Sequence, residues 1–197
     1  MRERQSVAGF VLAGGKSSRM GEDKAFLEFA GRTLLEIALE KVREVAPVTK
    51  VVGPRNSFGS GAIEDVFPDC GPLAGIHTAL THSSSELNLI LAVDTPFLEV
   101  PFLRLLIRQA KASQAVVTVP RTSDGYQPLC AVYRKDFLEL AEEALKDGRY
   151  KIDALFRQTE LRVVEEAELR RFAFAPAMFQ NLNTRAEYRH AKARKHD

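Results

Sequence analysis

The amino-acid sequence predicts a three-layer α/β/α fold with a mainly parallel β-sheet. Short apolar runs alternate with segments whose apolar residues recur at helical spacing, a pattern typical of βαβ units. The run at residues 87–93 is almost wholly apolar, as expected for a strand that is covered on both faces. No internal repeat or low-complexity linker divides the 197 residues, so we expect a single domain over residues 1–197.

In the first half of the chain the elements follow from apolar spacing and from start and stop signals. Thr33 and Glu36 have capping-box spacing, which predicts the start of a helix, and Pro47 predicts its end. Pro72 suits the first turn of a further helix. The expected elements are a strand at residues 7–12, a brief extended segment at 26–29, the helix between Thr33 and Pro47, a strand at 50–52, a polar turn at 53–61, a second extended segment at 62–66, a helix at 72–81 and the central strand at 87–93.

The second half continues the alternation and adds a peripheral strand. Pro101 is again placed for a helix start, and Thr184 with Glu187 repeats the capping-box spacing. The expected elements are a helix from residue 101, strands at 115–119 and 129–133, helices at 136–146 and 150–156, a peripheral strand at 160–164 and a C-terminal helix from 184.

Composition and charge narrow the class of protein. A hydrophobic content of 45% and a charged content of 27% are ordinary for a soluble globular protein. The formal net charge of +2 does not indicate nucleic acid or membrane as a partner, and no apolar run approaches the ~18 residues of a membrane span. Cys70 and Cys130 form neither a CxxC pair nor a disulfide framework. We therefore expect a reducing, cytoplasmic location.

A glycine-rich stretch, LAGGKSSRMGEDK at residues 12–24, follows the first strand. Glycines allow close backbone approach to an anion, and the interleaved Arg19 and Lys24 can neutralise its charge. Neither the Walker A spacing nor the dinucleotide spacing GxGxxG occurs. The stretch is thus a candidate polyphosphate site of another type, and the alternative is a flexible surface loop with incidental basic residues.

Asp94 stands at the end of the predicted central strand, before Thr95 and Pro96. In open α/β sheets ligands bind beyond the carboxyl ends of the strands, so we expect Asp94 and the 12–24 stretch to border one crevice. A carboxylate there suits a hard cation such as magnesium. From its position alone, Asp94 is equally expected to cap a turn or to bind a cation.

Asp65, in the sequence IEDVF, is a candidate for reading a base. Guanine presents N1–H and N2–H₂ donors side by side, and one carboxylate can accept both. Adenine lacks that pair, so Asp65 could select guanine. The alternative is an ordinary surface acid.

The string LAGGxSxRMGxDKA resembles the signature of sugar-phosphate-type nucleotidyltransferases, and within them most closely the molybdenum cofactor guanylyltransferase family. VDTPF at residues 93–97, GPLAG at 71–75, QPLCAVY at 127–133 and NLNT at 181–184 are similar to further motifs of that family. The resemblance implies a Rossmann-like nucleotidyltransferase fold. It also implies catalytic roles for Arg19, Lys24 and Asp94, with Asp94 as the metal ligand.

The resemblance implies contacts to the two substrates as well. The implied nucleotide-binding residues are Leu12, Ala13, Gly14, Gly15, Arg19, Gly21, Lys24, Asp65 and Asp94. The implied acceptor-binding residues are Gly71, Pro72, Gln127, Asn181 and Asn183. One departure is the turn after the second strand, where the family commonly has an asparagine and this chain has Gly53-Pro54-Arg55.

The implied reaction transfers GMP from GTP to molybdopterin and releases pyrophosphate, with Mg²⁺ as the metal and Mn²⁺ as its alternative. The implied partners are GTP, the molybdenum cofactor and proteins that deliver or receive it, and not nucleic acid or membrane. Two other readings stay open. The chain could use CTP or a sugar or polyol phosphate acceptor, or it could be a non-catalytic adaptor that binds nucleotide or cofactor.

Overall fold

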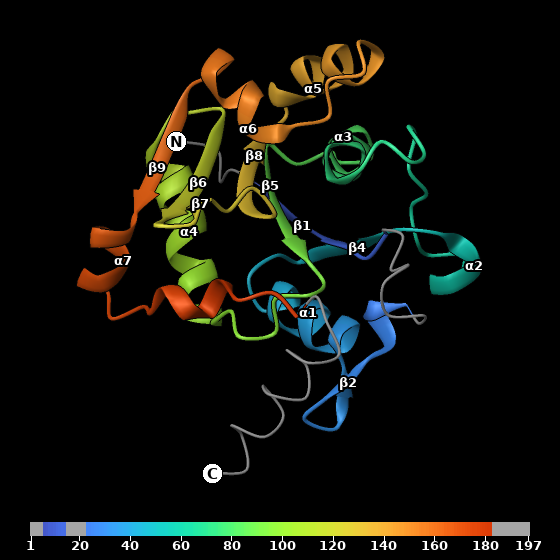
Figure 1. Cartoon of the computed structure of the whole chain (residues 1–197), viewed down its shortest axis with the longest axis horizontal. Coiled ribbons are helices and arrows are strands. Elements are labelled where there is room, and N and C mark those ends of the chain that lie inside the picture. The colour runs from blue at the N-terminus through green and yellow to red at the C-terminus, as the bar shows by residue number, and fades with distance from the viewer. Residues whose placement is uncertain (1–5, 15–22, 183–197) are drawn as a thin grey trace.

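The computed structural model describes residues 6–14 and 23–182, and these form a mixed, mostly parallel sheet with helices on both faces (Figure 1). The predicted fold class is thereby confirmed. In the described part of the chain the sheet has seven strands, in the spatial order β4 (Val48–Val52), β1 (Val7–Leu12), β5 (Leu87–Ala92), β8 (Cys130–Arg134), β6 (Val117–Thr122) and β7 (Gly125–Tyr126), with β9 (Leu161–Glu165) also paired to β6.

Strand directions bring three carboxyl ends to one level. β1 pairs in parallel with both β4 and β5, and Leu12 lies opposite Val52 on one side and Ala92 on the other. β8 runs antiparallel to both β5 and β6, whereas β9 runs parallel to β6. The predicted central strand is therefore parallel to one neighbour and antiparallel to the other. An apolar run indicates that a strand is buried on both faces, but it does not indicate whether the strand is parallel or antiparallel to its neighbours.

The helices begin and end largely where the sequence signals predict. The predicted capping box is present, because the Thr33 hydroxyl accepts from the Glu36 N–H at 3.2 Å and the Glu36 carboxylate accepts from the Thr33 N–H at 2.8 Å. The α-helices are α1 (Leu34–Arg43), α2 (Arg55–Phe58), α3 (Pro72–Thr81), α4 (Val100–Ala112), α5 (Phe137–Lys146), α6 (Ile152–Leu155) and α7 (Glu166–Arg171). The 3₁₀ turns are η1 (Lys24–Phe26), η2 (Phe156–Gln158) and η3 (Pro176–Phe179), and β2 (Glu28–Phe29) pairs with β3 (Arg32–Thr33) in a separate hairpin.

Two hydrophobic cores fill the spaces on either side of the sheet. α1 and α4 pack on one face, and α3 and α5 pack on the other (Figure 1). Neighbouring residues of β1 supply opposite cores, Val11 the first and Phe10 the second, and both side chains are fully buried. This alternation is why the strands are apolar at successive positions.

The segment after β4 differs from the prediction. Residues 53–61, predicted as a polar turn, contain the short helix α2, because Pro54 sets an extended backbone at its start and Gly59 ends it at φ 82°. Residues 62–66, predicted as an extended segment, form one parallel bridge between Ile63 and Val52. The elements β7, α7 and η3 were not predicted, and the predicted C-terminal helix from residue 184 lies outside the described residues.

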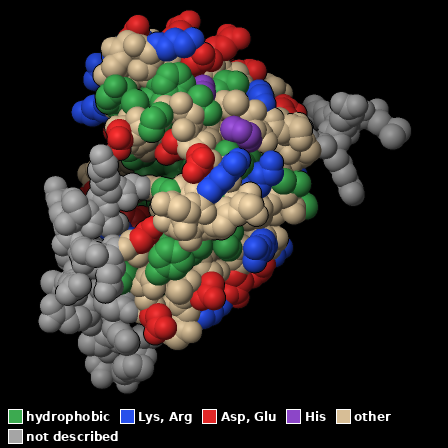
Figure 2. All heavy atoms as spheres, turned by 90° about the vertical axis from the view of Figure 1, so that its right-hand side faces the viewer, with side chains coloured by type: hydrophobic (Ala, Val, Ile, Leu, Met, Phe, Trp, Pro, Cys, Tyr) green, Lys and Arg blue, Asp and Glu red, His purple; other side chains and the backbone are tan. Residues whose placement is uncertain are grey.

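Charged side chains of both signs are interspersed over the face formed around β4, α2 and α3 (Figure 2). This distribution accords with the small formal net charge of +2. Among the described residues, no helix is both long enough and apolar enough to cross a membrane.

His77 lies buried in the α3–α5 interface. Because burial disfavours its charged form, we expect the stability of the protein to depend on pH. Its ring packs edge-on against Phe67 at 5.0 Å, and its Nε2 lies 4.0 Å from Glu142 Oε2. Burial lowers the pKa of His77 below its ordinary value, more than the Glu142 carboxylate raises it. The folded state therefore binds fewer protons than the unfolded state once the pH falls below about 6.5. This contribution to stability is complete above that pH and is lost in acid.

We expect the free energy of unfolding, measured with urea between pH 7.5 and 5.5, to fall less steeply in His77→Gln than in the unchanged chain. Glu142→Gln is the matched variant of opposite sign, because removing that carboxylate lowers the His77 pKa further and steepens the fall. Equal slopes in all three proteins would show that His77 does not govern this range.

Candidate active site

Lys24 and Asp94 form an ion pair at the level where β1, β4 and β5 end. Lys24 Nζ lies 3.4 Å from Asp94 Oδ2, and the two side chains are 21% and 16% exposed. They are 70 positions apart in the sequence, so the sheet brings them together. We expected the glycine-rich stretch and the end of the central strand to border one crevice. The contact between Lys24, from that stretch, and Asp94, at the strand end, agrees with this expectation.

Asp94 is held by hydrogen bonds of the turn that follows β5. The Thr95 hydroxyl donates to the Ala92 carbonyl at 2.9 Å, and the Asp94 carbonyl accepts from the Leu182 N–H at 3.0 Å. The Lys41 ammonium of α1 donates to the Pro96 carbonyl. The turn that contains Asp94 is thus held by three hydrogen bonds, and none of them uses the Asp94 carboxylate.

Lys24 opens the short turn η1, whose start is capped by Asp23. The Asp23 carboxylate accepts from the Ala25 N–H at 3.1 Å, and Ala25 is fully buried against α1. The following hairpin is tied back through a hydrogen bond from the Leu34 N–H to the Leu27 carbonyl at 3.0 Å. These contacts anchor the backbone on both sides of Lys24.

The backbone of Leu12–Gly14 continues the sheet past the end of β1. The N–H groups of Ala13 and Gly14 both donate to the Val52 carbonyl, at 2.9 and 3.3 Å, and the Leu12 carbonyl accepts from the Val93 N–H at 3.2 Å. A ligand contact from this backbone would therefore come from groups other than these. Gly14 is exposed and lies against Gly53 and Pro54.

Asp65 faces the same glycine. Its Oδ2 lies 3.7 Å from where a Cβ on Gly14 would stand. Burial raises the pKa of Asp65, and a hydrogen bond from the Thr78 hydroxyl lowers it. Oδ1 is buried and has no hydrogen-bond partner among the described residues. Asp65 is thus a half-buried carboxylate beside Gly14 at the edge of the candidate site.

An aromatic contact joins the two segments beside Gly14, and the sequence analysis did not find it. The rings of Phe26 and Phe58 stack with centroids 5.5 Å apart and planes at 24°. The Phe58 ring also covers Gly53, where an added Cβ would lie 2.8 Å from it. The turn that departs from the family pattern is therefore packed against the segment that carries Lys24.

The predicted acceptor residues lie on separate segments around this edge. Gly71 and Pro72 are exposed at the start of α3, and Gly71 has φ 72°. Gln127 is half-buried, and its side-chain amide donates to the Thr122 hydroxyl at 3.3 Å. Asn181 is exposed and precedes Leu182, whose N–H reaches Asp94. Of these, Asn181 is the one tied by a neighbouring hydrogen bond to the Lys24–Asp94 pair.

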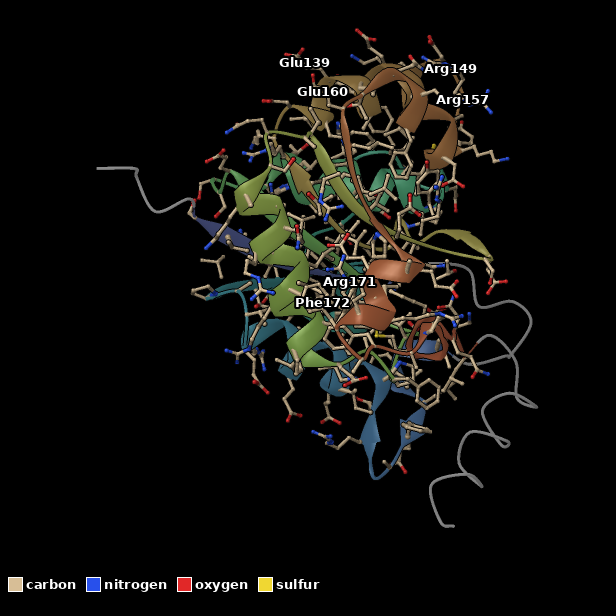
Figure 3. The ribbon with its side chains drawn as sticks, turned by 90° about the vertical axis from the view of Figure 1, so that its left-hand side faces the viewer. Glu139, Arg149, Arg157, Glu160, Arg171 and Phe172 are labelled. Atoms are coloured by element: carbon tan, nitrogen blue, oxygen red, sulfur yellow. The ribbon has the colours of Figure 1, made fainter. Side chains whose placement is uncertain are left out.

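The α5–α6 end of the molecule approaches the Gly71 segment through Tyr150. The neighbouring Cys70 thiol is the main reason that the pKa of Tyr150 is raised. Arg149 and Arg157 project outward from this end (Figure 3), and Arg149 pairs with Asp147 at 3.0 Å. Both arginines are exposed surface cations.

Four predicted site residues cannot be placed. Gly15, Arg19, Gly21 and Asn183 lie outside the described residues. Within residues 6–14 and 23–182 no group of three or more His, Cys, Asp or Glu side chains could hold a metal ion. Cys130 is buried, and burial raises the pKa of its thiol far above the usual range, so it packs as a small core residue.

Similarity to known proteins covers nearly the full chain. The family described as MobA-like NTP transferase domain matches residues 9–163. The molybdenum cofactor guanylyltransferase of Desulfosudis oleivorans is 35% identical over 193 residues, which is 95% of each protein. A crystal structure of molybdopterin-guanine dinucleotide biosynthesis protein A from Archaeoglobus fulgidus superposes with a TM-score of 0.83 at 25% identity, over 96% of this chain and 98% of that one.

The same fold also occurs in a transferase for another nucleotide. The structure of 2-C-methyl-D-erythritol 4-phosphate cytidylyltransferase from Thermus thermophilus superposes with a TM-score of 0.68 at 18% identity, over 95% of this chain and 98% of that one. This likeness concerns the fold alone. Fold similarity therefore does not separate a guanylyl from a cytidylyl donor.

Proposed function

The chain belongs to the MobA-like NTP transferase domain family, and on that premise we propose that it transfers GMP from GTP to molybdopterin. The observation that carries the proposal is the Lys24–Asp94 pair at 3.4 Å, with the half-buried Asp65 carboxylate across Gly14 on the neighbouring turn. A binding site for a nucleoside triphosphate needs a cation for the phosphates, a carboxylate for the metal ion and an acceptor for the base. Lys24, Asp94 and Asp65 offer these groups at one edge of the sheet. The relatives' names supply the acceptor.

In the proposed reaction a phosphate oxygen of molybdopterin attacks the α-phosphorus of GTP. An O–P bond forms there while the bond to the bridging oxygen breaks, and that oxygen leaves with its electron pair on pyrophosphate. The attacking phosphate is already an anion, so the reaction requires no general base. Catalysis then consists of positioning and charge stabilisation. This agrees with a site that offers the charged side chains of Lys24 and Asp94.

Lys24 neutralises the developing charge on the phosphates in this proposal, and Arg19 would add to it. The ammonium is held beside Asp94 by the anchored turn η1, so it is positioned before the nucleotide arrives. Preorganised cations of this kind act without reorganisation cost during the reaction.

Asp94 fits the role of magnesium ligand. Mg²⁺ is commonly bound by one or two carboxylates together with waters and substrate phosphates, and the partly exposed Asp94 carboxylate is such a group. A magnesium ion bound with the triphosphate would be held by Asp94 and would supply further charge neutralisation there; Mn²⁺ has the same ligand preference.

The donor base is tested by pyrophosphate release from GTP, CTP and ATP with molybdopterin and Mg²⁺. We expect kcat/KM for GTP to exceed that for CTP by about 10- to 100-fold, the discrimination typical of one bidentate base contact. Preference for CTP would overturn the guanylyl assignment. Tight GTP binding without pyrophosphate release would instead favour the adaptor reading, and turnover with a sugar or polyol phosphate in place of molybdopterin would favour the other acceptor class.

A further inference from the structure

The turn that follows Asp94 is held from outside the sheet by a lysine of α1. Pro96 is buried in this turn, and its carbonyl accepts a hydrogen bond from the Lys41 ammonium, 55 positions earlier in the chain. Lys41 is half-buried and lies in the last turn of α1. Since a buried carbonyl without a partner is costly, this hydrogen bond fixes where the turn lies relative to the helix.

The same helix also holds the segment that carries Lys24. Ala25, the next residue, is fully buried in the hydrophobic core to which α1 contributes. The N–H of Leu34, the first residue of α1, donates to the Leu27 carbonyl at 3.0 Å. One helix is therefore bonded to the Lys24 segment at its beginning and to the Asp94 turn near its end. It joins the two members of the ion pair by a second route besides the sheet.

An aromatic contact lies along this second route. Phe97, which follows Pro96, packs edge-on against Phe29 of β2, with ring centroids 5.5 Å apart and planes at 83°. Phe29 is buried and Phe97 is half-buried. The ring contact packs the turn against the hairpin, whereas the hydrogen bond from Lys41 fixes one backbone oxygen, two residues after Asp94. Lys41 is thus the polar group that links α1 to the backbone of this turn.

We propose that Lys41 is a positioning residue for the reaction, which holds the Asp94 carboxylate in place by binding the Pro96 carbonyl. The inference rests on the proposed function, because it takes Asp94 as the ligand of a magnesium ion bound with GTP. Magnesium demands nearly ideal octahedral geometry, so a displaced carboxylate is a poorer ligand. Groups that orient a metal ligand without touching the metal typically contribute 10- to 100-fold to metal affinity or activity.

Two other roles of Lys41 make different predictions. If the ammonium only satisfied a buried carbonyl, its loss would lower stability and leave nucleotide binding unchanged. If its charge attracted the phosphates directly, its loss would weaken GTP binding with and without magnesium alike. A positioning role instead reduces the magnesium-dependent gain, which is the factor by which Mg²⁺ strengthens the binding of GTP.

The test measures this gain by calorimetry, as the dissociation constant of GTP in EDTA divided by that in Mg²⁺, on the full chain. Lys41→Met and Lys41→Ala remove the donor, and Lys41→Arg retains it. We expect the gain to fall by about tenfold in Lys41→Met and Lys41→Ala, the lower end of the effect of such orienting groups. The turnover number for pyrophosphate release should fall with it. Lys41→Arg should keep both.

Two variants of α4 are the matched controls. Lys111→Met removes an exposed lysine from the last turn of that helix. Ile107→Val trims a buried side chain and should lower the melting temperature through lost packing alone. Both should retain the magnesium-dependent gain of the unchanged chain, so that neither loss of a positive charge nor loss of stability imitates the effect of Lys41.

The outcomes separate this inference from the proposed function. An unchanged gain in folded Lys41→Met or Lys41→Ala, even with a lower melting temperature, would overturn the role of Lys41 and leave the GTP assignment intact. An equal weakening of GTP binding in Mg²⁺ and in EDTA would overturn it as well, and so would loss of the gain in Lys41→Arg or in Ile107→Val. An unchanged chain that binds GTP no more tightly in Mg²⁺ than in EDTA would contradict both the proposed metal role of Asp94 and this inference.

Discussion

Asp94→Ala should reduce the rate of pyrophosphate release by about a thousandfold, the upper end of the effect of deleting one electrostatic group that acts in the transition state. The substitution removes the carboxylate proposed to hold the metal and leaves the Lys24 ammonium without that neighbour. The fold should survive, because the hydrogen bonds that fix this turn come from the Asp94 carbonyl, the Thr95 hydroxyl and Lys41. Steady-state kinetics with GTP and molybdopterin, together with a melting curve, measure both effects.

Asp136→Ala is the matched control, since Asp136 is an exposed acid at the start of α5 that makes no side-chain capping hydrogen bond. It should leave turnover unchanged. Asp94→Asn keeps the shape and loses the charge, so it should behave like Asp94→Ala. If Asp94→Ala turned over within about threefold of the unchanged chain, Asp94 could not be the metal ligand of the reaction.

Gly9→Ala is expected to have the largest effect on stability. A Cβ at Gly9 would stand 2.1 Å from Val42 Cγ1 and 3.0 Å from the Ala46 Cβ, and both of those residues are fully buried. Because the core on this side cannot yield without moving α1, we expect a loss of about 2–3 kcal/mol in the free energy of unfolding. Urea unfolding should show it as a lower midpoint at an unchanged slope.

Two further variants make the Gly9 experiment decisive. Gly61→Ala is the control, because a Cβ there meets no atom within 4 Å, and its effect should stay within about 0.5 kcal/mol. Val42→Ala should cost less in the Gly9→Ala background than alone, since it removes the atom that clashes. Additive losses from Gly9→Ala and Val42→Ala would contradict the proposed overlap.

The sequence predicts best where one local signal decides the structure. The capping box at Thr33 and Glu36 and the apolar strand at residues 7–12 both appear where predicted. The approach of Lys24 to Asp94 was also predictable, because strand carboxyl ends meet at one edge of a parallel sheet. By contrast, the packing of Phe58 against Gly53 and Phe26 joins segments that are far apart in the sequence, and no local spacing predicts such a contact.

The hydrogen bond from the Val66 N–H to the buried Thr78 hydroxyl, at 3.0 Å, was missed for a related reason. Thr78 falls within the almost wholly buried run of α3, where a threonine is read as one more small core residue. Its role becomes visible only when the turn after Ile63 is folded against the helix. A polar residue inside an apolar helical run was the one available signal, and it does not name the partner.

The antiparallel placement of β8 divides the functional edge into two kinds of boundary. Beside β4 the chain leaves the strand through a turn that leads to α2, so the described part of that rim consists of loop backbone and a helix beginning. On the other side of β5 in the sheet, the chain leaves β6, reverses into β7 and returns along β8 as an antiparallel ribbon. The Leu129 carbonyl before β8 accepts from the Ala92 N–H at 2.8 Å. On the proposed function, insertions in the first rim would alter the contacts to the nucleotide phosphates, whereas lengthening the ribbon would alter the opposite wall. Evolution could thus vary one substrate independently of the other.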